Sequence, residues 1–334
     1  MSKQTYSIIN KAIYPTKEKY NILTFDTHER YQQQMAKTGH NFYTFRYNGC
    51  KKWDFAYGYM PSNHYVLPEN AVVNGIDYDF ILTQSKFGQF QATQQINQIL
   101  RLPVISLEHT LPIDNWPGDQ LNAFRNMVGD LNVFISEYSE GKWAVNSPNT
   151  FVIHHSVDAN MFNPTQIATG TRENTVLTVV NDFINRDYCC NYSGFQRITE
   201  GMDNVRIVGK TEGLSEPAPS LKALASEYAS CGVYLNTSTV SPVPTSLLEA
   251  MACGCPVVST ATCMIPDIIE HGVNGFISND EDELRGYIEQ ILGDKDLSIR
   301  LGEAARQTIL DDFSEEKFIN SWNNIFNIAY GRKR

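Results

Sequence analysis

The feature that most constrains the fold is an alternation of short apolar runs with amphipathic stretches. In the first half of the chain, six apolar runs have the length and composition of buried strands. They are residues 21–25, 41–45, 79–84, 102–108, 131–136 and 150–156. Helical patterns lie between several of them, at residues 29–37, 89–100 and 139–146. Strands that alternate with helices predict a parallel, doubly wound sheet.

The same alternation starts again after a polar stretch at residues 158–174. Five further apolar runs predict a second parallel sheet, and helical patterns follow from Glu281 onward. The runs are residues 175–180, 205–209, 232–237, 256–260 and 275–278. A length of 334 residues also suits two domains. We expect an α/β protein with Rossmann-like domains at 1–160 and 161–315 that face a central cleft, and a C-terminal helix at 316–334 that crosses back to the first domain.

Composition narrows the class of protein. Hydrophobic residues at 42% and charged residues at 19% are typical of a soluble globular chain. No apolar run approaches the roughly 18 residues of a membrane span, and the N-terminal stretch has no hydrophobic signal core, so we expect a cytoplasmic protein. The seven cysteines show no paired spacing, which favours buried thiols over a zinc site or a disulfide framework. We predict no metal ligand.

Several motifs that carry chemistry in other proteins are incomplete here. A dinucleotide-binding GxGxxG is absent. Gly209-Lys210-Thr211 resembles the end of a phosphate-binding loop, but Asn204 takes the place of the leading glycine. Asp77 and Asp79 have the spacing of a metal-binding pair, a spacing that also arises often by chance.

The stretch "SPVPTSLLEAMACGCPVV", residues 241–258, is the most informative local pattern. Ser246 and Glu249 have the spacing of a capping box, in which a serine oxygen and a glutamate satisfy amides at a helix start. A helix start with the hydroxyls of Thr245 and Ser246, free amides and a positive dipole end also suits a pyrophosphate. The pattern alone leaves both interpretations open.

The region "LLEAMACGCPVV", followed by "IPDIIEHGVNGF" and "RLGEAARQTILDDFSEEKF", resembles the GT-B retaining glycosyltransferases of family 4. The resemblance covers most of residues 175–325. It extends more loosely to the first half through "AKTGHNFYTF", "LPVISLEHT", "VFISEYSEGKW" and "VDANMF". It implies a first domain that binds the acceptor and a second that binds a nucleotide-sugar. It also implies a transfer in which the donor's own phosphate accepts the acceptor's proton, with no obligatory cofactor.

The resemblance assigns donor-binding residues through a Glu-x7-Glu pattern. Its second glutamate matches Glu249, which implies hydrogen bonds to the ribose hydroxyls of a nucleotide-sugar. Its first glutamate, which contacts the transferred sugar in the family, falls on Ser241. Serine is shorter and neutral, so this departure concerns the identity of the donor sugar. We include Thr245 and Ser246 in the predicted donor site.

Two further family positions can be carried over to this chain. His109, at the end of a predicted strand, matches a histidine that lies beside the donor sugar, and we predict it as the catalytic residue. The arginine that neutralises the leaving diphosphate in the family falls on Asp182, which is a second departure. Arg186, or else Lys210, is expected to supply the positive charge, since a departing phosphate requires fixed cations or amides.

The predicted acceptor-binding half has an unusual aromatic segment. Residues 41–60 contain eight aromatic side chains, and we take Arg46, Lys51, Lys52 and Trp53 as candidate acceptor contacts. Aromatics interleaved with cations can stack on nucleic-acid bases or on sugar rings, or simply form a buried core. Residues 1–60 also carry nine Lys and Arg against four Asp and Glu, although the whole chain has a net charge of -10.

We therefore predict a hexosyl- or pentosyltransferase that moves a sugar from a nucleotide-sugar with retention of anomeric configuration. The acceptor expected for the family is a glycan or a lipid-linked sugar. An alternative is a phage-type enzyme that modifies hydroxymethylated DNA bases, which would need aromatic walls and backbone-binding charge. An alternative of another class is a non-catalytic binder of sugar nucleotides or glycans, because Ser241 and Asp182 depart from the family pattern.

Overall fold

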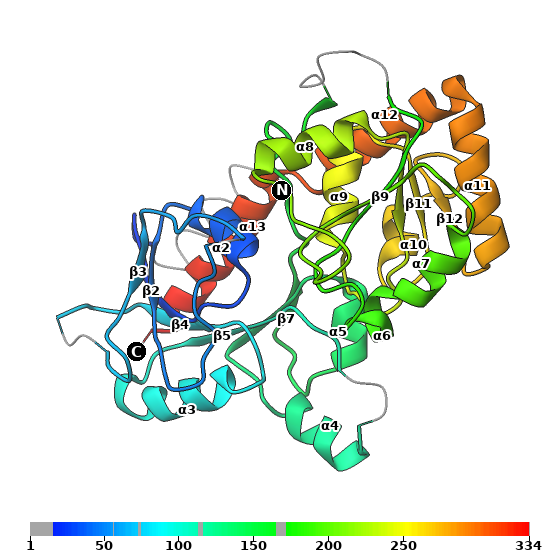
Figure 1. Cartoon of the computed structure of the whole chain (residues 1–334). Helices are drawn as coiled ribbons and strands as arrows, with labels where there is room; N and C mark the ends of the chain where they lie inside the picture. Colours follow the sequence, from blue (N-terminus) through cyan, green and yellow to red (C-terminus); the bar gives the residue numbers. More distant parts are fainter. Residues whose placement is uncertain (1–15, 56, 73–74, 113–115, 165–171, 334) are drawn as a thin grey trace, which may run out of the picture. The chain divides into compact units, whose positions relative to one another are not determined.

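The structure, a computed structural model, describes residues 16–55, 57–72, 75–112, 116–164 and 172–333. The chain divides into two compact units, each built around one parallel sheet (Figure 1). The first unit comprises the residues up to His154 together with those from Glu316 onward. The second unit is His155–Glu315. Two parallel-sheet α/β units confirm the predicted fold class.

The first unit contains a seven-stranded sheet in the order β3-β2-β1-β4-β5-β6-β7. Its strands are β1 (Asn21–Thr24), β2 (Asn41–Thr44), β3 (His64–Val66), β4 (Phe80–Thr83), β5 (Val104–Glu108), β6 (Leu131–Phe134) and β7 (Thr150–Val152). All neighbours pair in parallel. Each of the six predicted runs contains a strand, whereas β3 was not predicted. Two of the three residues of β3 are exposed, as suits a short edge strand.

Helices lie between several pairs of consecutive strands, which suits parallel pairing. They are α2 (Glu29–Ala36), α3 (Gln89–Leu100), α4 (Gly118–Arg125) and α5 (Glu137–Trp143). The C-terminal α13 (Glu315–Tyr330) belongs to the same unit. The predicted bounds of α3 are confirmed, and α2 lies within its predicted range. The helix predicted at residues 139–146 begins earlier in the structure, at Glu137, because Ser136 caps it by accepting a hydrogen bond from the amide of Ser139.

The second unit contains a five-stranded parallel sheet in the order β12-β11-β10-β8-β9. Its strands are β8 (Val176–Val179), β9 (Val205–Val208), β10 (Val233–Asn236), β11 (Val257–Ser259) and β12 (Phe276–Ile277). Its helices are α6 (Asp187–Cys190), α7 (Tyr192–Ile198), α8 (Leu221–Ser230), α9 (Thr245–Ala252), α10 (Ile265–Ile268), α11 (Glu281–Gly293) and α12 (Lys295–Asp312). Every strand lies within a predicted run.

Each sheet has one point at which the strand order reverses. In the first unit this point lies between β1 and β4, and in the second it lies between β8 and β10. In open α/β sheets, ligands bind beyond the carboxyl ends of the strands at such a point. The loops after β1 and β4, and those after β8 and β10, are therefore the first places to look for a site.

Helix α13 belongs to the first unit although it follows the second in sequence. Trp322 is fully buried and its indole nitrogen donates to the hydroxyl of Tyr31 in α2, at 3.1 Å. Phe326 stacks on Phe80 of β4 with ring centroids 5.3 Å apart. The helix thus packs on the first sheet and contributes buried side chains to the core of that unit.

Arg172 joins two helix ends in the second unit. Its guanidinium donates to carbonyl oxygens of Tyr228, Ala229 and Cys231 at the end of α8. It also donates to the carbonyl oxygens of Cys253 and Gly254 after α9, at 3.0 and 2.6 Å. A cation at two helix C-termini satisfies carbonyls that have no partner within the helix. Arg172 thus fixes the far end of the helix that carries Glu249.

Helix α12 packs closely against the end of α9 through two glycines. A Cβ atom built on Gly302 would lie 2.1 Å from the carbonyl oxygen of Gly254, so no larger side chain fits there without backbone movement. We predict that Gly302→Ala lowers the free energy of unfolding by about 2 kcal/mol, measured by urea denaturation. Gly286 lies in α11 with nothing within 4 Å of such a Cβ, so Gly286→Ala serves as the matched control. It should be neutral or stabilising by up to about 1 kcal/mol, because alanine is the better helix former.

Candidate functional site

The predicted donor residues gather at the strand-order reversal of the second sheet. Asp182 and Arg186 lie in the loop after β8, and Ser241 lies in the loop after β10. Since β8 and β10 are neighbouring parallel strands, both loops leave the same edge of the sheet. Helix α9 begins where the second of these loops ends. The arrangement therefore brings together a helix start and two loops at the position where α/β sheets bind ligands.

The loop after β10 is held on both sides. The amides of Thr239 and Val240 donate to the carbonyl oxygen of Cys189, at 2.9 and 3.2 Å. On the other side, the hydroxyls of Thr260 and Thr262 donate to the carbonyl oxygen of Ser238. These contacts fix the backbone that leads to Ser241. Ser241 itself is half-buried.

The start of α9 differs from the predicted capping box. The helix begins at Thr245, its N-cap is Pro244, and no side chain caps it. Ser246 therefore lies inside the first turn, and its hydroxyl accepts a hydrogen bond from the hydroxyl of Tyr234 at 2.8 Å. Of the two interpretations that the sequence left open, the capping box is not formed, because the proline before Thr245 already fixes an extended backbone there. The amides of Thr245 and Ser246 have no acceptor within the helix, which suits an anion.

Glu249 lies one turn further along α9 and is 6% exposed. Its Oε2 accepts a hydrogen bond from the hydroxyl of Tyr228 in α8, at 3.0 Å. Tyr228 is fully buried, so this bond sets the direction of the carboxylate. A buried carboxylate that is oriented by a neighbouring hydroxyl is suited to accept hydrogen bonds from a ligand.

The two candidate cations lie near the loop after β8. Arg186 is exposed, and its Nη1 lies 3.4 Å from the carbonyl oxygen of Asn181. Lys210 is also exposed, and its backbone joins the same loop, since its carbonyl oxygen accepts from the amide of Asp182 at 2.8 Å. Asp182 has a positive φ of 52°. The guanidinium of Arg186 and the backbone of Lys210 are thus held beside the reversal point.

Gly209, just before Lys210, has a structural explanation. Its φ is +134°, and a Cβ atom there would lie 2.0 Å from the carbonyl oxygen of Val180. Only glycine fits this conformation and this close approach. The resemblance of Gly209-Lys210-Thr211 to a phosphate-binding loop therefore reflects the packing of β9 against the end of β8.

His109 lies at the equivalent edge of the first sheet, directly after β5. Its ring is half-buried between two side chains from the β1–α2 region. It stacks on His28 with centroids 5.9 Å apart, and it meets Tyr31 edge-on at 4.6 Å. Burial lowers the pKa of His28 to about 4, so that ring is neutral near pH 7. The Nε2 of His109 lies 3.2 Å from Oε1 of Gln84.

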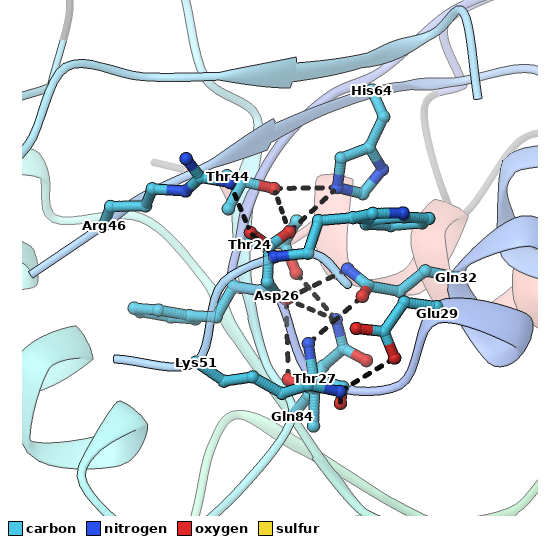
Figure 2. A network of polar contacts seen from close by, with 12 residues as sticks. Thr24, Asp26, Thr27, Glu29, Gln32, Thr44, Arg46, Lys51, His64 and Gln84 are labelled. Carbon is cyan, nitrogen blue, oxygen red and sulfur yellow. Dashed lines mark hydrogen bonds and ion pairs between the residues drawn. The ribbon is translucent and has the colours of Figure 1, made fainter. Parts of the chain in front are cut away.

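A buried polar network surrounds the loop after β1 (Figure 2). Asp26 is 2% exposed, and it accepts from Thr44, Arg46 and the amide of Trp53. His64, from β3, lies 2.7 Å from the hydroxyl of Thr44. The network ties β2, β3 and the segment after β2 to the end of β1. The network therefore fixes the loop that follows β1, one of the two strands beside the strand-order reversal of the first unit.

His64 makes this network sensitive to acid. Burial lowers the pKa of His64 to about 4, against the opposing attraction of Asp26. The unfolded chain therefore takes up a proton near pH 6.5 that the folded chain takes up only near pH 4, and stability is lost as the pH falls between these values. From pH 7 to 5 the loss due to this group is about 2 kcal/mol. We predict that His64→Gln reduces the pH dependence of urea unfolding by about that amount, and an unchanged dependence would contradict the assignment.

Three of the four candidate acceptor residues are engaged within the first unit. Arg46 pairs with Asp26 at 3.0 Å, and Lys51 pairs with the buried carboxylate of Glu29 at 2.8 Å. The indole nitrogen of Trp53 donates to the carbonyl oxygen of Gly58. Lys52 is exposed. These pairs hold the segment after β2 in place. Among the side chains that it exposes are two aromatic rings, Phe55 at 71% and Tyr59 at 66%.

The acidic pair noted in the sequence has ion-pair partners. Lys333 lies 2.8 Å from Asp77 and 3.3 Å from Asp79, and Lys17 lies 2.6 Å from Asp79. These contacts anchor the end of the chain to the start of β4. Over the described residues, no group of three or more His, Cys, Asp or Glu side chains has a metal-binding arrangement. In that same part of the chain, no helix combines the length and the apolar character that a bilayer span requires.

Sequence reasoning missed three polar residues at the edge of the first sheet, namely Asp26, His28 and Gln84. Each lies at or just beyond the carboxyl end of a predicted strand. The rule that ligands bind beyond such ends would have singled them out, because β1 and β4 flank the reversal of strand order. Their partners lie in other segments, which a single sequence does not reveal.

Residues 218–308 match the family described as "Glycosyl transferases group 1". Among curated proteins, the chain is 31% identical to N-acetyl-alpha-D-glucosaminyl L-malate synthase of Bacillus anthracis over 128 residues. It is 26% identical to an uncharacterized glycosyltransferase of Haemophilus influenzae over 132 residues. These alignments cover 37% and 38% of this chain, and only 30% and 37% of the relatives' own lengths.

Solved structures match nearly the whole chain at low sequence identity. Anabaena HepE in complex with UDP and glucose has a TM-score of 0.71 at 16% identity, covering 90% of this chain and 97% of that one. Sucrose-phosphate synthase from Thermosynechococcus elongatus has a TM-score of 0.68 at 14% identity, covering 92% and 98%. At such identities the likeness shows the fold. The chain therefore has the GT-B fold of two parallel-sheet α/β domains, and its residues 218–308 match the glycosyl transferases group 1 family.

Proposed function

We propose that this protein is a glycosyltransferase that takes its sugar from a nucleotide-sugar bound by the second unit. The observation that carries the proposal is the position of α9. Its start and its buried Glu249 lie beside the strand-order reversal of the sheet, within the segment that matches the glycosyltransferase family. The amides of Thr245 and Ser246 would receive the diphosphate, and Glu249 would accept hydrogen bonds from the ribose.

The proposed transfer proceeds with retention, as the resemblance to family 4 implies. The bond between the anomeric carbon and the diphosphate oxygen breaks, and the acceptor's hydroxyl oxygen bonds to the same face of the sugar. The acceptor's proton passes to the departing phosphate. Arg186 and Lys210 would balance the charge that develops on the diphosphate. His109 would contact the transferred sugar.

We propose a UDP-sugar as the first donor to examine, because HepE is described in complex with UDP and with UDP-glucose. Ser241 stands where the family has a glutamate that contacts the sugar. A neutral, shorter side chain there would favour a sugar with a different pattern of hydroxyls from the family's usual donors.

For the acceptor we propose a saccharide. The cations of Arg46 and Lys51 are paired with carboxylates, while Phe55 and Tyr59 are exposed. Aromatic faces suit sugar rings, whereas binding to a nucleic-acid backbone requires several cations directed at phosphates. Transfer to saccharides should therefore vary little with salt. Transfer to hydroxymethylated DNA that falls steeply with added salt would favour the nucleic-acid alternative instead.

The experiment is incubation of the protein with a panel of nucleotide-sugars and a mixture of saccharide acceptors. We expect release of a nucleoside diphosphate from one donor, and a glycoside whose anomeric configuration, read by NMR, matches that of the donor. Nucleotide binding without release from any donor would instead indicate a non-catalytic binder. An inverted product would contradict the retaining mechanism.

A further inference from the structure

Gln84 connects the strand-order reversal of the first sheet to His109. It follows β4 directly and is 1% exposed. Strands β4 and β5 pair in parallel with Thr83 opposite Ser106, so residues just after the two strands lie near each other. The side chain of Gln84 bridges from the end of β1 to the histidine after β5.

The contacts of Gln84 determine which way its amide points. Its Nε2 lies 3.0 Å from the carbonyl oxygen of Phe25 and 3.1 Å from the hydroxyl of Thr24. A carbonyl can only accept, so the atom that faces it must be the amide nitrogen. The hydroxyl of Thr24 donates to the carbonyl oxygen of Leu82, at 3.0 Å, and it therefore accepts from Gln84. A flipped amide would lose both bonds, so Oε1 must face His109.

This orientation determines the protonation pattern of the His109 ring. Because Oε1 of Gln84 is an acceptor, Nε2 of His109 must carry the proton across the 3.2 Å contact. In the neutral ring Nδ1 then has the lone pair. The ring plane is also held, since the edge of Tyr31 and the face of His28 flank it. Tyr31 in turn accepts from the indole of Trp322.

We propose that Gln84 is a positioning residue for His109, which holds the imidazole in one orientation and in the Nε2–H tautomer. The inference rests on the proposed function, in which His109 contacts the transferred sugar. The two tautomers offer opposite hydrogen-bonding capacities to a substrate hydroxyl. A ring that is held in one tautomer need not reorganise during each turnover. This lowers the activation barrier of the transfer and leaves the affinity for the substrate unchanged.

The chain supplies a matched control for this role. Gln32 is also buried, and its Nε2 donates to the same carbonyl oxygen of Phe25 at 3.0 Å. Its Oε1 accepts from the amide of Thr27, not from a histidine. Gln32→Met and Gln84→Met therefore remove similar hydrogen bonds to the same loop, but only the second removes the partner of His109.

The first measurement is the tautomer itself. In protein labelled with nitrogen-15 histidine, long-range proton–nitrogen spectra report which ring nitrogen carries the proton, and His109→Gln assigns the signal. We expect the Nε2–H pattern of His109 in the native chain and in Gln32→Met. We expect a mixture of tautomers in Gln84→Met. If Gln84→Met fails to fold, Gln84→Asn, which is one methylene shorter, replaces it. An unchanged tautomer in a folded Gln84 variant would overturn the proposal.

The second measurement is the kinetics of transfer. Gln84→Met should lower kcat by about tenfold with the donor KM within about twofold, as expected when an interaction acts on the transition state. Gln32→Met should leave both constants within about twofold of the native chain. An equal loss of kcat in the two variants would indicate a general effect on the loop and would overturn the positioning role. If no donor is turned over, the proposed function fails, and the NMR result still decides whether Gln84 sets the tautomer.

Discussion

Glu249→Gln is expected to weaken the binding of a nucleotide-sugar by about tenfold to a hundredfold, because hydrogen bonds to a charged group contribute about 1.5–3 kcal/mol. Glutamine has the same shape, and its oxygen can still accept from Tyr228, so the helix should remain intact. Calorimetric titration with UDP-glucose measures the affinity, and a thermal melt of the same sample measures stability.

The neighbouring glutamate on α8 provides the control. Glu227 pairs with Arg206, at 2.5 Å from Nη1. Glu227→Gln should change donor affinity less than twofold, because this carboxylate is engaged by Arg206 and is not part of the proposed donor site, and loss of the ion pair should cost at most about 1 kcal/mol of stability. Tyr228→Phe should give an intermediate loss, because the Glu249 carboxylate remains but loses the hydroxyl that orients it. A Glu249→Gln variant with native affinity would mean that this carboxylate serves the fold alone.

The second large effect is expected at Trp322. Trp322→Ala should lower the free energy of unfolding of the first unit by about 3–5 kcal/mol, since it removes a fully buried aromatic side chain. It also removes the hydrogen bond to Tyr31, which flanks His109. Urea denaturation followed by far-ultraviolet circular dichroism would measure the loss.

Trp116 provides the comparison for that substitution. It is only half-buried and stacks on Phe124 with centroids 4.7 Å apart. Trp116→Ala should cost about 1–2 kcal/mol, because the ring is half-buried and packs against Phe87, Phe124 and Trp143. Equal losses at the two positions would contradict the view that α13 contributes to the core of the first unit.

The sequence was most informative where burial is strongest. The central strands β4, β8 and β10 lie in nearly continuous apolar runs, because strands covered on both faces need apolar side chains throughout. The edge strand β3 has no such run, since two of its three residues are exposed. It pairs with β2, and its His64 contacts Asp26 across 38 residues of sequence.

The candidate site was predictable in part for a related reason. Glu249 and Ser241 lie within one contiguous motif, whereas the partners of His109 come from two other segments, around residues 28–31 and at Gln84. The capping-box pattern places the N-cap of α9 at Ser246, two residues after the observed N-cap Pro244, which determines where the helix begins. The side-chain partners Tyr228 and Gln84 follow only from the packing of helices and strands that are distant in sequence.

A crystal structure of the protein with bound UDP would test the central claim most directly. We expect the diphosphate at the amides of Thr245 and Ser246, and the ribose hydroxyls within about 3 Å of the Glu249 carboxylate. UDP bound away from the start of α9, or a ribose that makes no hydrogen bond to Glu249, would contradict it.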